Sequence, residues 1–261
     1  MKSGFIAIIG RPNAGKSTLL NQIVGTKLAI VSDKPQTTRT RILGVKQGND
    51  CHPGQAVFVD TPGIHRPLYR MNVRMVDQAV EAIKQMDVSL VVVDASVSSG
   101  AGDRFVLGLL EAADGPVVLA INKIDLIAKH RLLPIMDRYQ KAYGFSALVP
   151  ISARTGDGVP ELESVIWSLL PNGEPYYPVD YLTDQPERVI AAEMVREKLL
   201  TYTEKELPFS SAVVVDKFEE AGADGVMRLY CSIVVDRETQ KPIVIGRGGA
   251  RIKQIGTEAR Q

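Results

Sequence analysis

The chain of 261 residues has few cysteines, no long hydrophobic run and almost no net charge. Cys51 and Cys231 lie far apart without metal-ligand spacing, which excludes a disulfide framework or a zinc motif and indicates reduced thiols. No apolar stretch approaches the ~20 residues that span a bilayer, and the N-terminus has no signal-peptide cleavage site. Because the net charge is +1, a nucleic-acid surface would need local charge asymmetry. We expect a soluble, cytoplasmic protein.

A regular alternation of apolar strands and amphipathic helices runs from residue 5 to residue 170. Compact β-branched runs predict strands, buried on both faces of a mostly parallel sheet, at 5–9, 56–59, 89–93, 116–121 and 147–151. Helical periodicity predicts helices between them, at 17–24, 72–85 and 159–170. Residues 41–47 are predicted to pair with 56–59 as a hairpin, which adds an antiparallel edge. The predicted fold of this region is α/β with three layers.

A proline-containing break separates this region from a smaller one. We predict a first domain at 1–171, a linker at 172–182 and a second domain at 183–261. The second domain is expected to begin with a helix at 186–206, whose apolar face includes Val189, Val195 and Leu199. Strands at 211–219 and 227–236 follow, and then a glycine loop at 246–249 leads into a last helix at 250–261.

Residues 10–17, GRPNAGKS, match the phosphate-binding pattern GxxxxGK[ST] between a predicted strand and a predicted helix. The glycines let main-chain amides surround the β-phosphate, Lys16 reaches the β- and γ-phosphates, and Ser17 ligates Mg²⁺. The motif predicts a P-loop NTPase domain but does not separate ATP from GTP. Its predicted nucleotide-binding residues are Gly10, Arg11, Pro12, Asn13, Ala14, Gly15, Lys16 and Ser17.

A second motif, DTPG, follows the predicted strand at 56–59. Its Asp60, at the end of that strand, can hold the Mg²⁺ shell, and Gly63 can contact the γ-phosphate and move when that group leaves. Thr61 and Pro62 complete the turn at the nucleotide. In the polar stretch 35–40, we predict that Thr38 completes the metal sphere, with Thr37 as the second choice. The predicted metal ligands are Ser17, Thr38 and Asp60.

The third motif, NKID at 122–125, also follows a predicted strand. Asp125 can accept two hydrogen bonds from guanine, whereas adenine would leave the buried carboxylate unpaired. Asn122 would support the base and the loop, and the stem of Lys123 would cover the ring. Ser152 and Ala153, after the next strand, would meet guanine O6. The motif therefore predicts GTP and GDP as ligands.

A basic glycine loop, VIGRGGARI at 244–252, lies near the end of the chain. Residues 241–261 hold five basic residues and one acidic residue, whereas 183–240 hold seven basic and twelve acidic residues. Since a glycine loop lets the main chain approach phosphates and Arg247 can pair with them, this concentrated charge predicts RNA binding. The predicted RNA contacts are Gly246, Arg247, Gly248, Gly249, Arg251 and Lys253.

These motifs in this order resemble the Era family of GTPases, in which a GTPase domain precedes a type II KH domain. GRPNAGKS, KPQTTR at 34–39 and IKQIG at 252–256 look like this family, so the resemblance covers nearly the whole chain. It implies an α/β P-loop NTPase domain followed by a smaller α+β type II KH domain. The implied function is a GTPase switch that binds 16S-type ribosomal RNA and the 30S-type subunit and assists small-subunit biogenesis. The family also implies peripheral contact with the inner membrane, and we expect a monomer.

Two departures from the family pattern affect these expectations. Ile64 follows DTPG, where many GTPases have a glutamine that orients water, so hydrolysis is expected to be slow. In related GTPases an Asn at the position of Asn13 ligates K⁺ beside the phosphates, and we expect K⁺ to assist turnover. The expected catalytic residues are then Lys16, Asn13, Thr38 and Gly63. The chain also stops at Gln261, where a type II KH domain continues into another strand, so we expect an incomplete KH domain.

Two other functions remain open at this point. An RNA-binding module with a structural, rarely hydrolysed guanine nucleotide would be consistent with Ile64. A P-loop ATPase would share the phosphate loop, but the NKID motif argues against it.

Overall fold

The structure is a computed structural model that describes residues 1–34, 37–64, 76–77, 80–81, 83–204, 206–208, 210–222 and 225–260. It consists of two compact units. Unit 1 contains Met1–Ala29 and Pro35–Asp184, and unit 2 contains Ile30–Lys34 and Gln185–Gln261. No helix in the described ranges has the length and apolar character needed to cross a bilayer.

Unit 1 is built on a six-stranded sheet with the order β2-β3-β1-β4-β5-β6. All neighbouring strands are parallel except β2, which pairs with β3 as the antiparallel edge of a hairpin. This arrangement confirms the mostly parallel α/β fold predicted from the apolar runs. The strands are β1 (Lys2–Gly10), β2 (Ile42–Gln47), β3 (Gly54–Asp60), β4 (Val88–Asp94), β5 (Val117–Asn122) and β6 (Ala147–Pro150).

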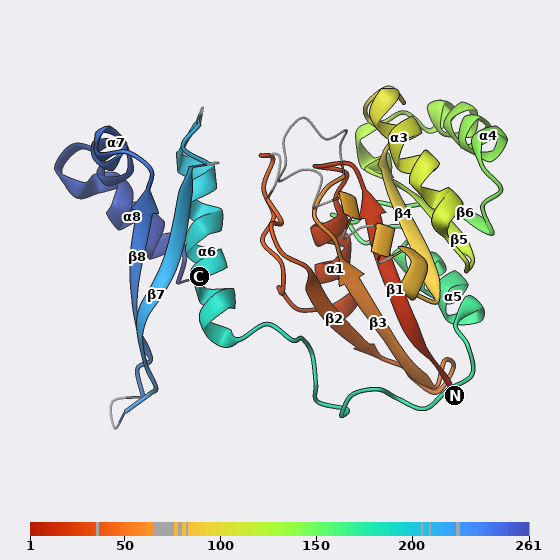
Figure 1. The fold of residues 1–261 in the computed structure, drawn as a ribbon, viewed down its shortest axis with the longest axis horizontal. Helices are drawn as coiled ribbons and strands as arrows, with labels where there is room; N and C mark the ends of the chain where they lie inside the picture. Colours follow the sequence, from red (N-terminus) through yellow and green to blue (C-terminus); the bar gives the residue numbers. More distant parts are fainter. Residues whose placement is uncertain are drawn as a thin grey trace. The chain divides into compact units, whose positions relative to one another are not determined.

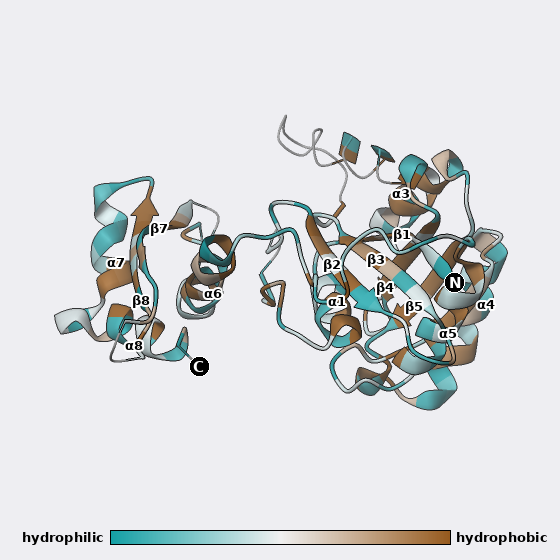
Figure 2. Ribbon diagram, turned by 90° about the horizontal axis from the view of Figure 1, so that it is seen from below, coloured by the Kyte–Doolittle hydropathy of each residue, from teal (hydrophilic) through white to brown (hydrophobic). Residues whose placement is uncertain are grey.

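Helices cover both faces of this sheet, and each face has its own hydrophobic core (Figure 1). One core joins the strands to α1 (Lys16–Val24) and α5 (Val159–Leu169), and the other joins them to α3 (Ala101–Leu109) and α4 (Leu132–Ala142). Successive side chains of a strand point to opposite faces, so the apolar strands supply both cores, and hydrophobic residues concentrate in the sheet (Figure 2). The helix expected at 72–85 falls largely outside the described residues; 76–77, 80–81 and 83–85 are helical.

The segment expected to be a linker, 172–182, lies along β2 and β3 of unit 1. The fully buried Gln55 accepts hydrogen bonds from the amides of Tyr176 and Tyr177 and donates one back to Tyr177. Farther along, the amide of Val45 in β2 donates to the carbonyl oxygen of Leu182 at 2.8 Å. Unit 1 therefore extends to Asp184, because the main chain of this segment hydrogen-bonds to the edge strand β2 and to the Gln55 side chain of β3.

Unit 2 combines one long helix, a hairpin and two shorter helices. They are α6 (Glu187–Tyr202), β7 (Ser211–Glu219), β8 (Arg228–Val235), α7 (Lys241–Ile245) and α8 (Ala250–Glu258). The core contains Leu199, Leu207, Val244 and Ile255. Within the described ranges β8 pairs with β7 alone. This element order is that of the predicted KH domain.

The buried face of α6 contains most of the predicted apolar residues, since Leu199 is fully buried and Val195 and Tyr202 pack against the core. Two features were not predicted. Val189 is 40% exposed, whereas the charged Arg196 and Glu197 are buried. Glu197 is met by the segment Ile30–Lys34, which belongs to unit 2 although it precedes β2 in the chain. The Val31 amide donates to the Glu197 carboxylate at 3.2 Å, and the Arg196 guanidinium pairs with Glu193 at 2.6 Å. Buried charges are tolerated on this face because they are hydrogen-bonded.

Candidate nucleotide site and glycine loop

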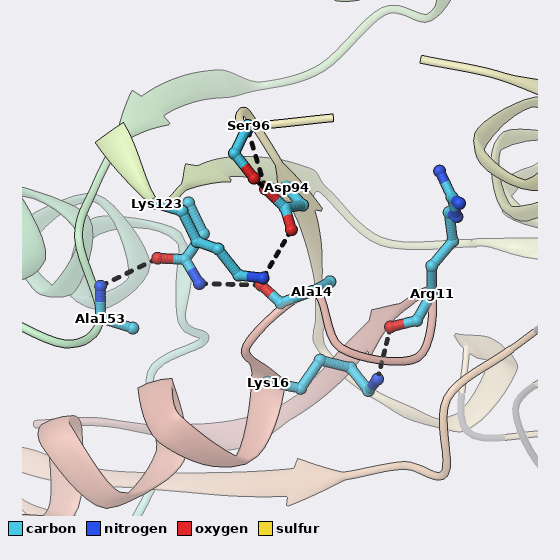
Figure 3. A network of polar contacts seen from close by, with 8 residues as sticks. Arg11, Ala14, Lys16, Asp94, Ser96, Lys123 and Ala153 are labelled. Atoms are coloured by element: carbon cyan, nitrogen blue, oxygen red, sulfur yellow. Dashed lines mark hydrogen bonds and ion pairs between the residues drawn. The ribbon is translucent and has the colours of Figure 1, made fainter. Parts of the chain in front are cut away.

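The phosphate loop connects β1 to α1, at the edge of the sheet where the parallel strands end. Lys16 is buried, and its ammonium donates to the carbonyl oxygen of Gly10 at 3.2 Å and to that of Arg11 at 3.0 Å, the latter drawn in Figure 3. Burial lowers the pKa of Lys16, and the Asp60 carboxylate opposes this shift. Asn13 adopts a left-handed conformation, with φ 61°, which is uncommon for a residue with a side chain. The loop thus holds a buried cation where a phosphate would find a charged partner.

Three oxygen-bearing side chains meet at the end of β3. The Ser17 hydroxyl donates to Asp60 Oδ2 at 2.7 Å and lies 2.8 Å from the Thr38 hydroxyl, which itself lies 3.4 Å from Asp60 Oδ2. Burial raises the pKa of Asp60, although Lys16 and the two hydroxyls act in the opposite direction. The predicted metal ligands Ser17, Thr38 and Asp60 are therefore brought together.

The other carboxylate oxygen of Asp60 tests whether this site suits a metal ion. Asp60 Oδ1 is buried and has no hydrogen-bond partner among the residues that the structure describes. An unpaired buried carboxylate oxygen is costly, and Mg²⁺ prefers oxygen ligands of this kind. The donor set therefore fits Mg²⁺, which Asp60, Ser17 and Thr38 would hold.

The DTPG turn packs directly against the phosphate loop. The Thr61 hydroxyl donates to the carbonyl oxygen of Ile8 at 2.9 Å, which anchors the turn to β1. A Cβ on Gly63 would lie 2.7 Å from the Cα of Pro12, so only glycine allows this close approach. The Ile64 side chain is fully buried in the core on the α3 and α4 face. Pro35, Gln36 and the stretch 65–75 lie outside the described residues.

Asn122 links the phosphate loop to the loop after β6. Its side-chain amide donates to the carbonyl oxygen of Ala14 at 2.8 Å and accepts from the amide of Ala153 at 2.9 Å (the dashed lines that end at Ala14 and Ala153 in Figure 3). Gly15 is essential to this arrangement, since its φ is 96° and a Cβ there would lie 2.2 Å from Asn122 Nδ2. One buried side chain therefore fixes the predicted phosphate and base regions relative to each other.

Asp125 and Ser152, both predicted to serve the base, form a hydrogen bond. The Ser152 hydroxyl donates to Asp125 Oδ1 at 2.7 Å. Arg154, which sequence reasoning did not assign to the site, pairs with Asp125 Oδ2 at 3.1 Å and is 75% exposed. Guanine can compete with such an exposed arginine for the carboxylate, because surface ion pairs contribute little free energy.

Two more acidic residues at the site were missed. Asp94 ends β4 and pairs with Lys123 at 2.5 Å, and Asp103 at the start of α3 pairs with Arg11 of the phosphate loop at 2.9 Å. The signal for Asp94 was present, because it is a carboxylate at the end of a parallel strand, like Asp60. Asp103 carried no such signal, since its pairing depends on how α3 packs.

The glycine loop of unit 2 lies between α7 and α8. Gly246, Gly248 and Gly249 all have positive φ angles, of 74°, 57° and 80°. The predicted RNA contacts Arg247 and Lys253 are exposed, whereas the Arg251 guanidinium donates to the carbonyl oxygen of Ile243 at 2.5 Å. Beside these cations, three isoleucines are more than two-fifths exposed: Ile243, Ile245 and Ile252. A basic loop next to exposed apolar side chains suits a nucleic-acid strand, which offers phosphates and bases.

Known proteins share both halves of this arrangement. A family model described as a 50S ribosome-binding GTPase matches residues 5–123, and a KH domain model matches residues 206–261. GTPase Era of Geotalea uraniireducens (strain Rf4) is 51% identical over 260 residues, which cover 100% of this chain and 86% of the relative. GTPase Era of Heliobacterium modesticaldum (strain ATCC 51547 / Ice1) is 43% identical over 261 residues, or 100% of this chain and 86% of the relative.

A solved structure matches over the same extent. The crystal structure of Era in complex with MgGDPNP and nucleotides 1506–1542 of 16S ribosomal RNA has a TM-score of 0.93 and 41% sequence identity. The match covers 100% of this chain and 88% of that one.

Proposed function

Because the chain belongs to the Era family of GTPases, we propose that it binds and hydrolyses GTP in unit 1 and binds 16S-type ribosomal RNA through unit 2. The observation that carries the nucleotide half is the Asn122 amide, which joins the phosphate loop to the loop carrying Ser152 and Ala153. A ligand with phosphates at one end and a guanine at the other spans the regions that Asn122 connects. We further propose that the two activities serve small-subunit biogenesis.

The base preference can be tested by exchanging an acceptor for a donor. Asp125→Asn replaces one carboxylate oxygen with an NH₂ group, which suits the C2 carbonyl of xanthine better than the C2 amine of guanine. We expect GTP affinity to fall by roughly 100-fold and XTP to become the better ligand, since an unmatched buried polar group is costly. Fluorescent-nucleotide competition measures both, with ATP as the wild-type control. Unchanged GTP affinity would refute the assignment of Asp125.

For hydrolysis, we propose that Asp60, Ser17 and Thr38 hold Mg²⁺, which offsets the charge of the β- and γ-phosphates. Lys16 binds the same phosphates, and the Gly63 amide contacts the γ-phosphate. Since the Ile64 side chain is buried and apolar, it cannot orient the attacking water. Slow turnover follows from the missing polar group.

We also propose that K⁺ assists this slow reaction through Asn13. Asn13 belongs to the phosphate loop, and its main chain there is left-handed, with φ 61°. Phosphate release at equal ionic strength should be about tenfold faster in K⁺ than in Na⁺, since a bound cation offsets developing charge. In Asn13→Ala the two salts should give the same rate. Equal rates in the wild type would remove K⁺ from the mechanism.

A second candidate function is RNA binding with a structural, rarely hydrolysed guanine nucleotide, and the buried Ile64 favours it. Multiple-turnover phosphate release with Mg²⁺ and K⁺ separates the two, because a structural nucleotide gives no more than one turnover. A switch additionally requires that RNA crosslinking to unit 2 differ between the GDP form and a GTP-analogue form. Arg247→Asp is the control that removes the exposed cation of the glycine loop.

The remaining proposals rest on the family. We propose a cytoplasmic monomer that meets the 30S-type subunit and contacts the inner membrane peripherally. Light scattering tests the oligomeric state. Flotation with anionic vesicles tests the membrane contact, and a protein that stays at the bottom of the gradient contradicts it.

A further inference from the structure

Asp94, a carboxylate outside the phosphate-loop, DTPG and NKID motifs, faces the guanine-binding region. It is the last residue of β4, and the strand register places it opposite Asn122 at the end of β5. The next amide, of Ala95, donates to the carbonyl oxygen of Asn122 at 2.9 Å. Because both strands end here, Asp94 lies beside the start of the NKID motif without belonging to it.

Both oxygens of the Asp94 carboxylate are engaged. Oδ2 accepts a hydrogen bond from the Lys123 ammonium at 2.5 Å, and Oδ1 accepts from the amide of Ser96 at 2.8 Å and from its hydroxyl at 2.5 Å (Figure 3). The Asp94 side chain is 14% exposed and that of Lys123 is 29% exposed. Ser96 therefore fixes the carboxylate, and the carboxylate holds the end of the lysine side chain.

The main chain also restricts Lys123. Its φ is 66°, in the left-handed region that a residue with a side chain seldom adopts. A lysine side chain is otherwise flexible, and ordering it when a ligand binds reduces affinity. Fixing both ends of the stem in advance removes that loss.

We propose that Asp94 is a positioning residue for guanine-nucleotide binding: through Lys123 it holds the lysine stem where it covers the purine ring. This inference rests on the proposed binding of GTP and GDP in unit 1. Asp94 itself touches the ammonium and Ser96, and Asp125 reads the edge of the base. Loss of Asp94 should therefore weaken the binding of GDP and of GTP by the same factor. The rate of hydrolysis at saturating GTP should stay unchanged, because the phosphate end is untouched.

Asp94→Asn removes the charge and keeps an oxygen for Ser96. We expect its affinity for fluorescent GDP to fall about tenfold with an unchanged kcat for GTP. Ser96→Ala, which frees only one side of the carboxylate, should lose about threefold. Asp137→Asn is the matched control, because Asp137 pairs with Lys141 at 2.7 Å on the exposed face of α4. It should bind GDP like the wild type.

A double-mutant cycle separates positioning from a general role in folding. Lys123→Met keeps the stem but removes the ammonium through which Asp94 acts. If the proposal holds, adding Asp94→Asn to Lys123→Met changes GDP affinity by less than twofold. A further tenfold loss in the double mutant, or wild-type affinity in Asp94→Asn, would overturn it. Absence of GDP binding by the wild type would instead contradict the proposed function.

Misfolding is checked with the single tryptophan, Trp167, which lies in α5 of unit 1. If Asp94→Asn unfolds at the same temperature as the wild type, as followed by Trp167 fluorescence, and its GDP affinity is reduced, the proposal is supported. If Asp94→Asn is unfolded at the assay temperature, the proposal is tested with Ser96→Ala instead. In that variant unchanged GDP affinity contradicts the proposal.

Discussion

Two glycine loops in this chain are predicted to offer main-chain amides to phosphate, and their surroundings differ. In the loop at 10–17, a Cβ on Gly15 would lie 2.2 Å from the Asn122 amide, and Asn122 is itself bound on both sides. In the loop at 246–249, a Cβ on Gly246 would lie 2.8 Å from the Cβ of the nearby Arg251, but one on Gly248 or Gly249 would meet no atom of the described structure within 4 Å. The first loop is therefore enclosed by residues distant in sequence, whereas the tip of the second loop at Gly248 and Gly249 is open.

This difference shows where each site obtains its affinity. The nucleotide site is preorganised, because buried partners hold Lys16, Asp60 and Asn122 before any ligand binds. At the RNA loop the exposed Arg247 and the glycines leave the ligand to supply most contacts. Single substitutions should therefore reduce ligand affinity strongly at the nucleotide site. At the loop at 246–249 they should reduce RNA affinity only slightly and in a salt-dependent way.

The sharpest test of this comparison is the same substitution in both loops. Gly15→Ala adds a Cβ at φ 96° against a fixed amide, and nucleotide affinity should fall by more than about 100-fold, since backbone strain and overlap act together. Gly248→Ala adds one at φ 57° into open space, so RNA affinity should fall by less than about fivefold. Fluorescent GDP and an RNA with nucleotides 1506–1542 of 16S ribosomal RNA are the probes.

Each variant serves as the other's control, because the other ligand should bind to it normally. Similar losses in the two loops would mean that backbone restriction, not enclosure, limits both. The comparison would then fail.

Substitution of the exposed Arg247 in the loop at 246–249 should reduce RNA affinity by an intermediate amount. Arg247→Gln removes one phosphate contact, so the slope of log K against log salt should become shallower by about 0.7, the value for one contact with a single strand. RNA affinity at low salt should fall several-fold, and GDP affinity should not change. Lys141→Gln, on the exposed part of α4 in unit 1, is the matched control. An unchanged salt slope would exclude phosphate pairing by Arg247.

Much of the nucleotide site could be predicted because its requirements are local. The glycines of the phosphate loop, the lysine after them and the carboxylates at predicted strand ends can all be read from the sequence. Asp94 satisfied the same strand-end rule but was missed, because its meaning depends on the register that places it beside Lys123. The pairing of Arg11 with Asp103 likewise needs the packing of α3, which no motif encodes.

What the sequence did not predict concerns segments whose partners are distant in sequence. Periodicity correctly placed Leu199 in the core of unit 2, but it also placed the exposed Val189 there and did not predict the buried Glu197, to which Ile30–Lys34 supplies a main-chain donor. Residues 172–182 had the composition of a linker, yet the amides of Tyr176 and Tyr177 bind the buried Gln55. Composition reports polarity and does not report which strand edge a segment will meet.

The smallest expected effect concerns acid stability and tests whether the nucleotide site is held together before ligand binds. Burial acts to raise the pKa of the Asp94 carboxyl, but hydrogen bonds from Lys123 and Ser96 outweigh it, so its folded pKa lies below the ordinary 3.8. Asp94 therefore stabilises the folded state above pH 3.8, and this contribution is lost as the pH falls through the lower, folded pKa.

Urea unfolding followed by Trp167 fluorescence measures this effect in unit 1. The wild type should be more stable than Asp94→Asn at pH 6, by about 1 kcal/mol or less because the pair is partly exposed. The difference should shrink as the pH is lowered below 4, where the wild-type carboxyl becomes neutral like the amide. Asp137→Asn should show a smaller difference at pH 6. A gap between wild type and Asp94→Asn that stays constant down to pH 3 would show that Asp94 does not act through its charge, and Lys123 would then owe its position to the backbone alone.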